Sequence, residues 1–288
     1  MSSKLLAAAS LLLFLCSNAH AGLFDSVTRN LGTITKAAKA TEKAARPISE
    51  EEEYYVGRAV AARIVATYPL LKNPGLTEYV NSIGRTLSLH SEKPYTYGGY
   101  HFAILDSDEM NAFACPGGII FITRGMLRAA ENEEELAAVL AHEIAHINNR
   151  DGISSIKSSR WTEALTVIGS SAAKQYSSRE VAQLVGIFEG SIDDIVKTLV
   201  VNGYSKSQEY AADKASIAIA QKAGYSSSAL YDLLGRMAGR STEGGITKTH
   251  PDTSDRIDNI KDLIKSRSAD PSSLSRRTDR FRSAPTTR

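Results

Sequence analysis

The segment VLAHEIAHINNRD, residues 139–151, carries the strongest structural signal in this chain. It places two histidines four residues apart, with a glutamate directly after the first. In an α-helix, residues four apart lie about 40° apart around the axis and roughly 6 Å apart along it. His142 and His146 can therefore point in the same direction, with Glu143 beside them. The spacing predicts that these side chains form one cluster on a helix.

The helix that carries this cluster is expected to be buried. Asn132 followed by Glu135 has the spacing of a helix-capping box, with asparagine in place of serine or threonine. A buried imidazole without a partner is energetically costly, so we favour a bound metal ion over a helix that merely contains two hydrogen-bonded histidines. The apolar residues that indicate burial are Leu136, Val139, Leu140, Ile144 and Ile147.

The spacing is the H-E-x-x-H arrangement of zinc proteases. Zinc accepts two imidazoles readily, and a catalytic zinc site has three protein ligands and one open position. Glu143 could reach a water at that position, which makes it the candidate general base. We therefore expect one zinc ion per chain, held by His142, His146 and a third residue from elsewhere in the sequence.

A later segment, SKSQEYAAD at residues 205–213, offers a candidate third ligand. Glu209 and Asp213 lie four apart on a predicted helix. Glu209 could bind zinc while Asp213 accepts a hydrogen bond from a ligand histidine and fixes its tautomer. Spacing alone is weak support, because such acidic pairs usually form a solvated face. The remaining candidate ligands are His90, His101 and His250.

The region around the histidine helix predicts a mixed class of fold. Strand-like segments at residues 100–106, 109–118 and 118–125 are rich in β-branched and aromatic residues and are bounded by Gly, Pro and Asp. Helical patterns occupy residues 50–68, 76–89, 205–223 and 226–237. We therefore expect an α+β fold, mainly helical, in which a small antiparallel sheet packs beside the histidine helix.

The composition is that of an ordinary globular protein. The chain has 288 residues, 42% of them hydrophobic, and a formal net charge of +2, which gives no reason to expect nucleic acid as a partner. Residues 1–21 resemble a cleaved secretion signal, residues 22–48 a leader segment, and residues 49–266 the main domain. Residues 267–288 are rich in Ser, Arg and Pro and predict a disordered basic tail, whose arginines could contact a membrane surface peripherally.

The two cysteines bear on the location of the protein. Cys16 lies inside the predicted signal, so a lipid-anchored form is the alternative to simple cleavage and release into the periplasm. Leu15 before it is not the small residue typical of a lipidation site, so we favour cleavage. Cys115 would then remain alone and could form no internal disulfide, so we expect it to be buried as a small core residue rather than to bind metal.

The chain resembles a known family of zinc metallopeptidases. That family includes the CAAX prenyl proteases, the heat-shock protease HtpX, the mitochondrial protease Oma and the periplasmic proteases BepA and LoiP. The resemblance covers roughly residues 51–264 and implies a minimal zincin-like protease domain. It rests on the ordered motifs NAFACPGG (111–118), IIFITRGML (119–127), ELAAVLAHEIAHINNRD (135–151), YSKSQEYAADKASI (204–217) and THPDTSDRI (249–257).

The resemblance also implies roles for individual residues. It makes Glu209 the third zinc ligand and Asp213 its supporting residue. His250 matches a histidine that either assists catalysis or caps the zinc in a latent state, and Arg256 matches an arginine near the site. Either residue is a candidate catalytic group that shares the negative charge of the transition state. Without the resemblance, His250 would be interpreted as part of a turn and Arg256 as a surface ion pair.

Two positions depart from the family pattern. The family often has a histidine where this chain has Asp151, and an aliphatic or small residue where it has Cys115. We expect neither residue to contact zinc, so the departures do not argue against activity.

The predicted function is that of a secreted, periplasmic zinc endopeptidase. Its expected substrates are unfolded or misassembled envelope proteins, including outer-membrane proteins, bound as extended strands along Asn111, Ala112 and Phe113. One alternative is a chaperone-like envelope assembly factor with a latent or weak protease site. A second is a structural zinc module, which would need a closed site with four ligands.

Overall fold

The structure is a computed structural model that describes residues 48–156, 190–238, 249–250, 253–264 and 271–285. All of these residues belong to one compact unit. The predicted secretion signal, Cys16 and the leader up to residue 47 lie outside the described residues, as does the first part of the predicted tail.

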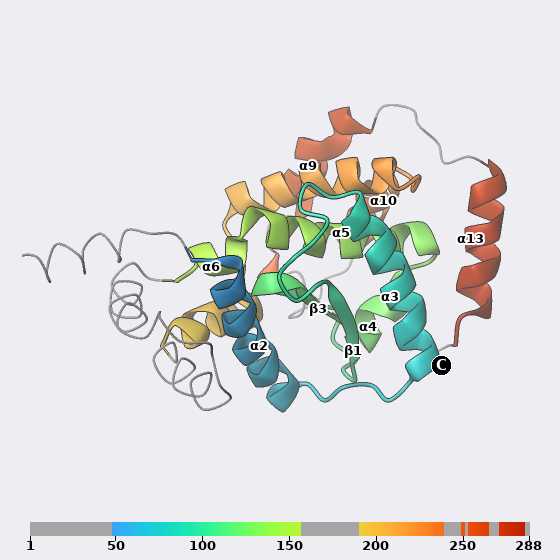
Figure 1. The fold of residues 1–288 in the computed structure, drawn as a ribbon. Helices are drawn as coiled ribbons and strands as arrows, with labels where there is room; N and C mark the ends of the chain where they lie inside the picture. Colours follow the sequence, from blue (N-terminus) through green and yellow to red (C-terminus); the bar gives the residue numbers. More distant parts are fainter. Residues whose placement is uncertain (1–47, 157–189, 239–248, 251–252, 265–270, 286–288) are drawn as a thin grey trace, which may run out of the picture. The chain divides into compact units, whose positions relative to one another are not determined.

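The fold is mainly helical, as the sequence predicted, and the expected helices are present with small shifts at their ends (Figure 1). Residues 190–197 are also helical and continue into a π-helical turn, η2 (Thr198–Asn202). No helix among the described residues is both long enough and apolar enough to cross a bilayer. The named α-helices are α2 (Glu50–Thr67), α3 (Pro74–Leu89), α4 (Arg124–Ala129), α5 (Glu133–Asn149), α6 (Asp151–Ser154), α9 (Lys206–Lys222), α10 (Ala229–Ala238), α12 (Thr253–Ile260) and α13 (Pro271–Ser283).

Three short strands form one small sheet, β1 (His101–Leu105), β2 (Ala112–Cys115) and β3 (Ile119–Thr123), in the order β1-β3-β2. The pairing of β2 with β3 is antiparallel, as predicted, but β1 runs parallel to β3, so the sheet is mixed. The tight turn η1 (Pro116–Gly118) makes β2 and β3 a hairpin, and β1 takes the remaining edge of β3. Strand patterns in the sequence identify strands but do not specify their neighbours.

The η1 turn requires glycine at position 117. Gly117 has a φ of 77°, a conformation that residues with a side chain adopt only at a cost. A Cβ atom at this position would lie 2.6 Å from the Cα of Tyr54 in α2. The turn can therefore pack directly on α2 only because glycine has no side chain.

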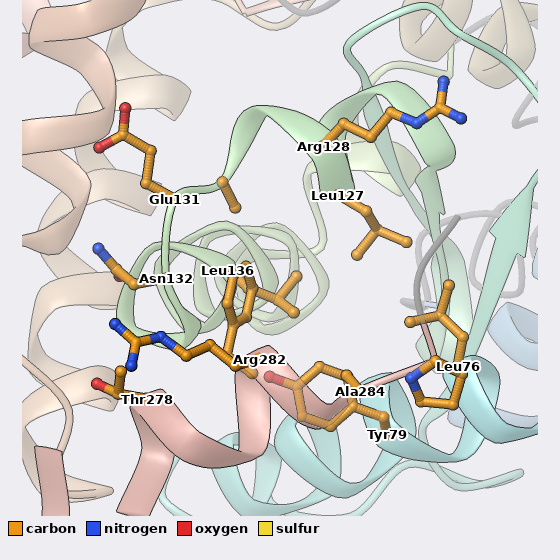
Figure 2. Close-up of a pocket in the computed structure, with 13 residues that line it drawn as sticks. Leu76, Tyr79, Leu127, Arg128, Glu131, Asn132, Leu136, Thr278, Arg282 and Ala284 are labelled. Atoms are coloured by element: carbon orange, nitrogen blue, oxygen red, sulfur yellow. The ribbon is translucent and has the colours of Figure 1, made fainter. Parts of the chain in front are cut away.

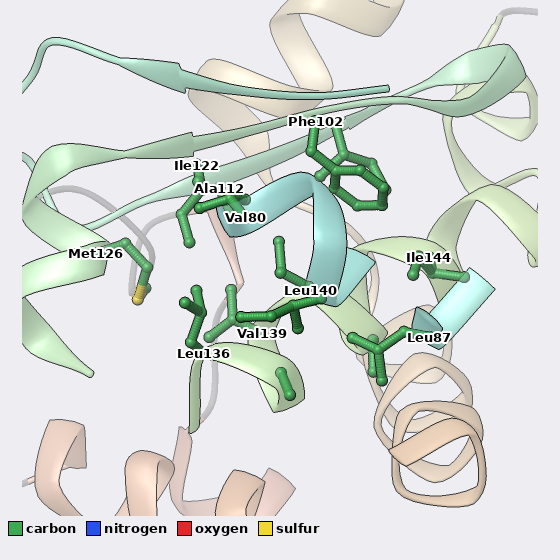
Figure 3. Packing of buried hydrophobic residues seen from close by; sticks show 14 of the residues in the cluster. Val80, Leu87, Phe102, Ala112, Ile122, Met126, Leu136, Val139, Leu140 and Ile144 are labelled. Carbon is green, nitrogen blue, oxygen red and sulfur yellow. The ribbon is translucent and has the colours of Figure 1, made fainter. Parts of the chain in front are cut away.

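Helix α5 lies at the centre of the core. Residues 133–147 of this helix are all buried, and α5 packs against α3, α9, α10 and the sheet. Fully burying a side chain such as Leu140 or Ile144 contributes roughly 1.5–3 kcal/mol. Figure 3 shows the side chains that meet here, among them Val80 and Leu87 from α3, Phe102, Ala112 and Ile122 from the sheet, and Leu136, Val139, Leu140 and Ile144 from α5.

The ends of α5 have specific partners. Asn132 caps the helix by accepting a hydrogen bond from the backbone N–H of Glu135 at 2.9 Å, as predicted. The second half of the predicted capping box does not form, because the Glu135 carboxylate accepts from the backbone N–H of Glu131 at 2.8 Å instead. At the other end, Arg150 has a φ of 58° in the left-handed region and directs the chain into α6. The helix therefore stops after Asn149, and the next residues fold back beside it.

The predicted disordered tail is wrong for residues 271–283, which form helix α13. Arg277 of this helix is buried and its Nε lies 2.5 Å from Oε1 of Glu134 in the first turn of α5. The next turn of α13 pairs Arg280 with Glu133. Composition indicated a solvated tail because it cannot show that buried glutamates elsewhere in the chain would pair with these arginines.

Candidate metal centre

Four potential metal ligands meet next to the C-terminal half of α5. They are His142 and His146 from α5, Glu209 from α9 and His250, and all four are buried. The Nε2 atoms of His142 and His146 are 3.0 Å apart. Each of these nitrogens lies 3.5 Å from a carboxylate oxygen of Glu209.

The spacing of these donors fits a tetrahedral zinc ion. Ligands about 2.0–2.1 Å from a tetrahedral centre are separated from one another by roughly 3.3 Å. Five of the six pairs of ligands have donor atoms between 2.9 Å, for His250 Nδ1 and Glu209 Oε1, and 3.5 Å apart, and all four donor atoms lie within 4.8 Å of one another. Two or three imidazoles with one carboxylate is also a ligand set that zinc favours. The residues therefore fit the metal that the H-E-x-x-H spacing predicted.

Glu143 lies beside the cluster with its carboxylate buried. Among the described residues, neither of its carboxylate oxygens has a hydrogen-bond partner. His250 lies close by, with its Nε2 3.9 Å from Oε1 of Glu143. A buried carboxylate is costly when it lacks a partner, so this one is placed to accept a proton from a molecule bound at the site.

Each α5 histidine has an aspartate behind it. Oδ1 of Asp213 lies 3.0 Å from Nδ1 of His142, and Oδ2 of Asp151 lies 2.8 Å from Nδ1 of His146. Burial lowers the pKa of His146, but the carboxylates of Asp151 and Glu209 outweigh it and raise the pKa to about 10. Because Nδ1 faces an aspartate in both residues, Nε2 is the nitrogen directed into the cluster.

Helix α9 places both of its acidic residues at the site. Ser205 and Gln208 form a capping box that starts this helix, and Glu209 follows directly. Burial alone would raise the pKa of Glu209, but the three cluster histidines hold it well below its usual range. The capping box thus fixes where α9 begins and, through it, where Glu209 enters the cluster.

Arg256 is buried rather than on the surface of α12. Its guanidinium donates to both oxygens of Asp213, at 2.9 and 2.7 Å, and lies 3.2 Å from Oε2 of Glu209. Burial raises the pKa of Asp213, but the Arg256 guanidinium outweighs it and brings the pKa to about 2. In this geometry the arginine orients the two carboxylates of α9.

His250 occupies the fourth corner of the cluster. Its Nδ1 lies 3.3 Å from Nε2 of His142 and 2.9 Å from Oε1 of Glu209. The preceding residue, Thr249, donates from its hydroxyl to the side-chain oxygen of Asn111 at 3.1 Å. Asn111, which the sequence suggested as a substrate contact, therefore also positions the segment that carries His250.

The other predicted substrate residues, Ala112 and Phe113, begin β2 and have buried side chains. β2 is an edge strand, and no described strand pairs with its second edge. The second edge of β1 is instead partly covered by residues 69–71, through Leu71 N to Ile104 O at 2.8 Å and Asp106 N to Pro69 O at 2.7 Å. Of the two edges, that of β2 is therefore the one without a described strand or bridge, although its four residues are at most 3% exposed.

The remaining candidate ligands lie outside the cluster. His90 and His101 are exposed and contact backbone carbonyls, those of Thr86 and Gly98. Cys115 is buried in the core as expected, and burial raises the pKa of its thiol.

Two residues that contact His146 were not predicted from the sequence. Asp151 reaches it only because Arg150 reverses the chain. The ring of Tyr204 stacks on the imidazole with centroids 4.3 Å apart. No local spacing indicates either contact, although Tyr204 does open the motif that contains Glu209.

A groove of about 860 Å³ lies at the opposite, N-terminal end of α5. Figure 2 shows its walls, which include Leu76 and Tyr79 of α3, Leu136 of α5 and Arg282 of α13. None of its lining residues belongs to the metal-ligand cluster. The groove is therefore separate from the metal-ligand cluster.

The fold and the cluster together define a metalloprotease with an H-E-x-x-H helix and a glutamate from a later helix. Residues 74–264 match the model of peptidase family M48. The chain belongs to peptidase family M48, a family of zinc metallopeptidases. This confirms the family that the sequence motifs indicated.

Individual relatives match over part of their length. The chain is 27% identical over 212 residues to the beta-barrel assembly-enhancing protease of Escherichia coli K12, which covers 71% of this chain and 42% of that protein. The protein of the same name from Yersinia pestis is 29% identical over 67% of this chain and 39% of its own length. A protease HtpX homolog from Salinibacter ruber is 32% identical over 41% of this chain and 44% of its own. The chain thus spans less than half the length of these relatives.

Proposed function

We propose that this protein is a periplasmic zinc endopeptidase that hydrolyses peptide bonds in unfolded or misassembled envelope proteins. The observation that supports this most directly is the arrangement around α5. Two histidines and a glutamate place donor atoms 3.0–3.5 Å apart, a spacing that suits three ligands of a tetrahedral zinc ion, and the unpartnered carboxylate of Glu143 lies beside them. A purely structural metal site has no use for an unpaired buried carboxylate.

His142, His146 and Glu209 would hold one zinc ion per chain. When bound, zinc supplies a Lewis acid that acidifies water and polarises a peptide carbonyl. The chain's own contribution is orientation: Asp151 and Asp213 direct the two imidazoles, and Arg256 fixes Asp213 and Glu209. In this proposal Arg256 is a positioning residue, whereas the sequence suggested that it shares the charge of the transition state.

Glu143 is the general base of the proposed reaction. It takes a proton from the attacking water at one of its carboxylate oxygens and transfers it to the leaving amine. Burial keeps bulk water away from this carboxylate, and no described residue competes for its oxygens. A substrate strand added along β2 beside Ala112 and Phe113 would run past this group, and its backbone bonds would demand little of its sequence.

His250 provides a means of keeping the site latent. Its Nδ1 is spaced from His142 and Glu209 as a fourth zinc ligand would be, which would take the position needed by the substrate. This geometry also suits the alternative function, a chaperone-like assembly factor that cuts rarely. It suits a structural zinc module equally, so removal of His250 is the informative change.

Location and substrates are inferred from sequence and from the relatives. The first 21 residues have the features of a secretion signal, with lipid attachment at Cys16 as the alternative. The matched relatives from Escherichia coli and Yersinia pestis are named beta-barrel assembly-enhancing proteases. We infer that envelope proteins, outer-membrane proteins among them, are the partners of this chain as substrates.

The test is cleavage of casein and of an unfolded outer-membrane protein by the purified chain, with and without a zinc chelator. We expect cleavage that the chelator abolishes and that Glu143→Gln lacks, while Glu143→Gln still binds zinc and substrate. His250→Ala should increase cleavage if His250 caps an active site. Loss of zinc or of the fold in His250→Ala would instead indicate a structural site, and cleavage that Glu143→Gln retains would refute the proposed mechanism.

A further inference from the structure

Asp151 lies behind His146 through a reversal of the chain. Arg150, with its φ of 58°, ends α5 and starts α6, and Asp151 is the first residue of α6. This places Oδ2 of the buried Asp151 carboxylate 2.8 Å from Nδ1 of His146. The opposite nitrogen of His146, Nε2, consequently faces His142 and Glu209.

The second oxygen of Asp151 is bound by Gln208 from α9. Gln208 Nε2 lies 3.1 Å from Asp151 Oδ1 and 3.0 Å from Oγ of Ser154. The amide cannot be reversed, because its Oε1 accepts the backbone N–H of Ser205 at 3.0 Å in the capping box. Gln208 therefore donates and Asp151 accepts, one residue before Glu209 in the sequence.

Taking the metal site proposed above as given, we propose that Asp151 is a positioning residue for His146 and that Gln208 couples it to the helix carrying Glu209. Asp151 keeps the proton of His146 on Nδ1 and leaves the Nε2 lone pair for the ion. Gln208 holds the carboxylate in place from the other side. The family resemblance does not assign this role, since family members often have histidine at this position.

The direction of the hydrogen bonds at Asp151 makes the inference testable. Asp151 accepts at both oxygens, from His146 and Gln208, with Asn149 Nδ2 a weaker third donor at 3.5 Å. Asparagine at this position offers one oxygen and one NH₂, so either His146 or Gln208 would face a second donor. Asp151→Asn should therefore weaken zinc binding, by roughly 10- to 100-fold for loss of such a partner.

A second substitution should reverse the effect. Gln208→Glu alone places a carboxylate against Asp151, and it should also weaken zinc binding, although glutamate preserves the capping box with Ser205. In the double variant, the carboxylate introduced at position 208 accepts from the amide introduced at position 151. The amide oxygen is then free to accept from His146, and zinc affinity should recover about tenfold or more relative to Asp151→Asn.

The experiment measures zinc affinity by competition with a chelator, together with the visible absorption spectrum of the cobalt-substituted protein. Wild type, both single variants and the double variant are compared, with circular dichroism to show that each is folded. Asp255→Asn is the matched control, because Asp255 forms an exposed pair with Lys206 at 2.8 Å in the same turn of α9. We expect the control to bind zinc as wild type does and the cobalt spectrum to change only in the single variants.

The outcomes separate this inference from the proposed function. If wild type binds zinc tightly and Asp151→Asn binds it equally tightly, this inference is overturned and the proposed function is not. A double variant that binds zinc more weakly than both single variants would also overturn it. General destabilisation makes the losses of the two substitutions add, whereas restored donor–acceptor pairing makes the second substitution offset the first. Wild-type protein that binds no zinc would overturn the proposed function and this inference with it.

Discussion

The pairing of Arg277 with Glu134 predicts that the C-terminal helix α13 stabilises the whole domain. The two side chains are only 10% and 8% exposed, and Arg277 also lies 4.7 Å above the ring of Tyr225. Removing one partner of a buried ion pair costs about 3–5 kcal/mol, because the other charge stays buried. Glu134 keeps one donor, the backbone N–H of Ser226 at 2.6 Å, so we expect Arg277→Ala to fall near 3 kcal/mol, the lower end of that range.

Urea unfolding followed by circular dichroism measures this cost, and a thermal scan should show a decrease in Tm of about 6–12 °C for a domain of this size. Arg276→Ala is the matched control, since Arg276 is the exposed neighbour on the same helix and should change stability by less than about 0.5 kcal/mol. Replacing the pair together, as Glu134→Gln with Arg277→Met, should recover much of the loss. Equal stability of Arg277→Ala and Arg276→Ala would show that α13 does not pack on α5 as described.

Three further predictions concern the site and the sheet. Glu143→Gln should reduce kcat by at least about a hundredfold while zinc content, measured by elemental analysis, stays at one per chain; an active variant would exclude Glu143 as the base. The pKa of Asp213 is about 2 in the folded protein, below its ordinary value of 3.8. The ionised carboxylate therefore stabilises the fold by roughly 2 kcal/mol above about pH 4, and this contribution is lost as the pH falls toward 2. Urea midpoints of the metal-free protein between pH 5 and 2 should show this loss, and Asp213→Asn should lack that component of it. Gly117→Ala should destabilise the domain by more than about 1–2 kcal/mol, because the left-handed φ is unfavourable for alanine and the added Cβ would lie too close to Tyr54. A smaller cost in urea unfolding would contradict the tight contact between η1 and α2.

The sequence by itself determined those features that depend on residues close together in the chain. The spacing of His142 and His146 places them on one helix face whatever the helix packs against. The cap at Asn132 and the three strand segments were equally local, and they appear in the structure where they were predicted. Spacing alone did not identify Glu209 as a metal ligand, because two acidic residues four apart on a helix have the same spacing whether they face solvent or bind a metal.

The tertiary structure alone decided which distant groups meet. His250 joins the cluster although it lies 104 residues after His146 in the sequence. Asp151 contacts His146 because Arg150 adopts a left-handed conformation, which the sequence composition does not predict. The parallel neighbour of β3 and the burial of α13 on α5 depend in the same way on partners far along the chain. Local preferences are set by a few neighbouring residues, whereas these contacts are selected by the packing of the whole core, which buries each charge only where an opposite charge or donor is already in place.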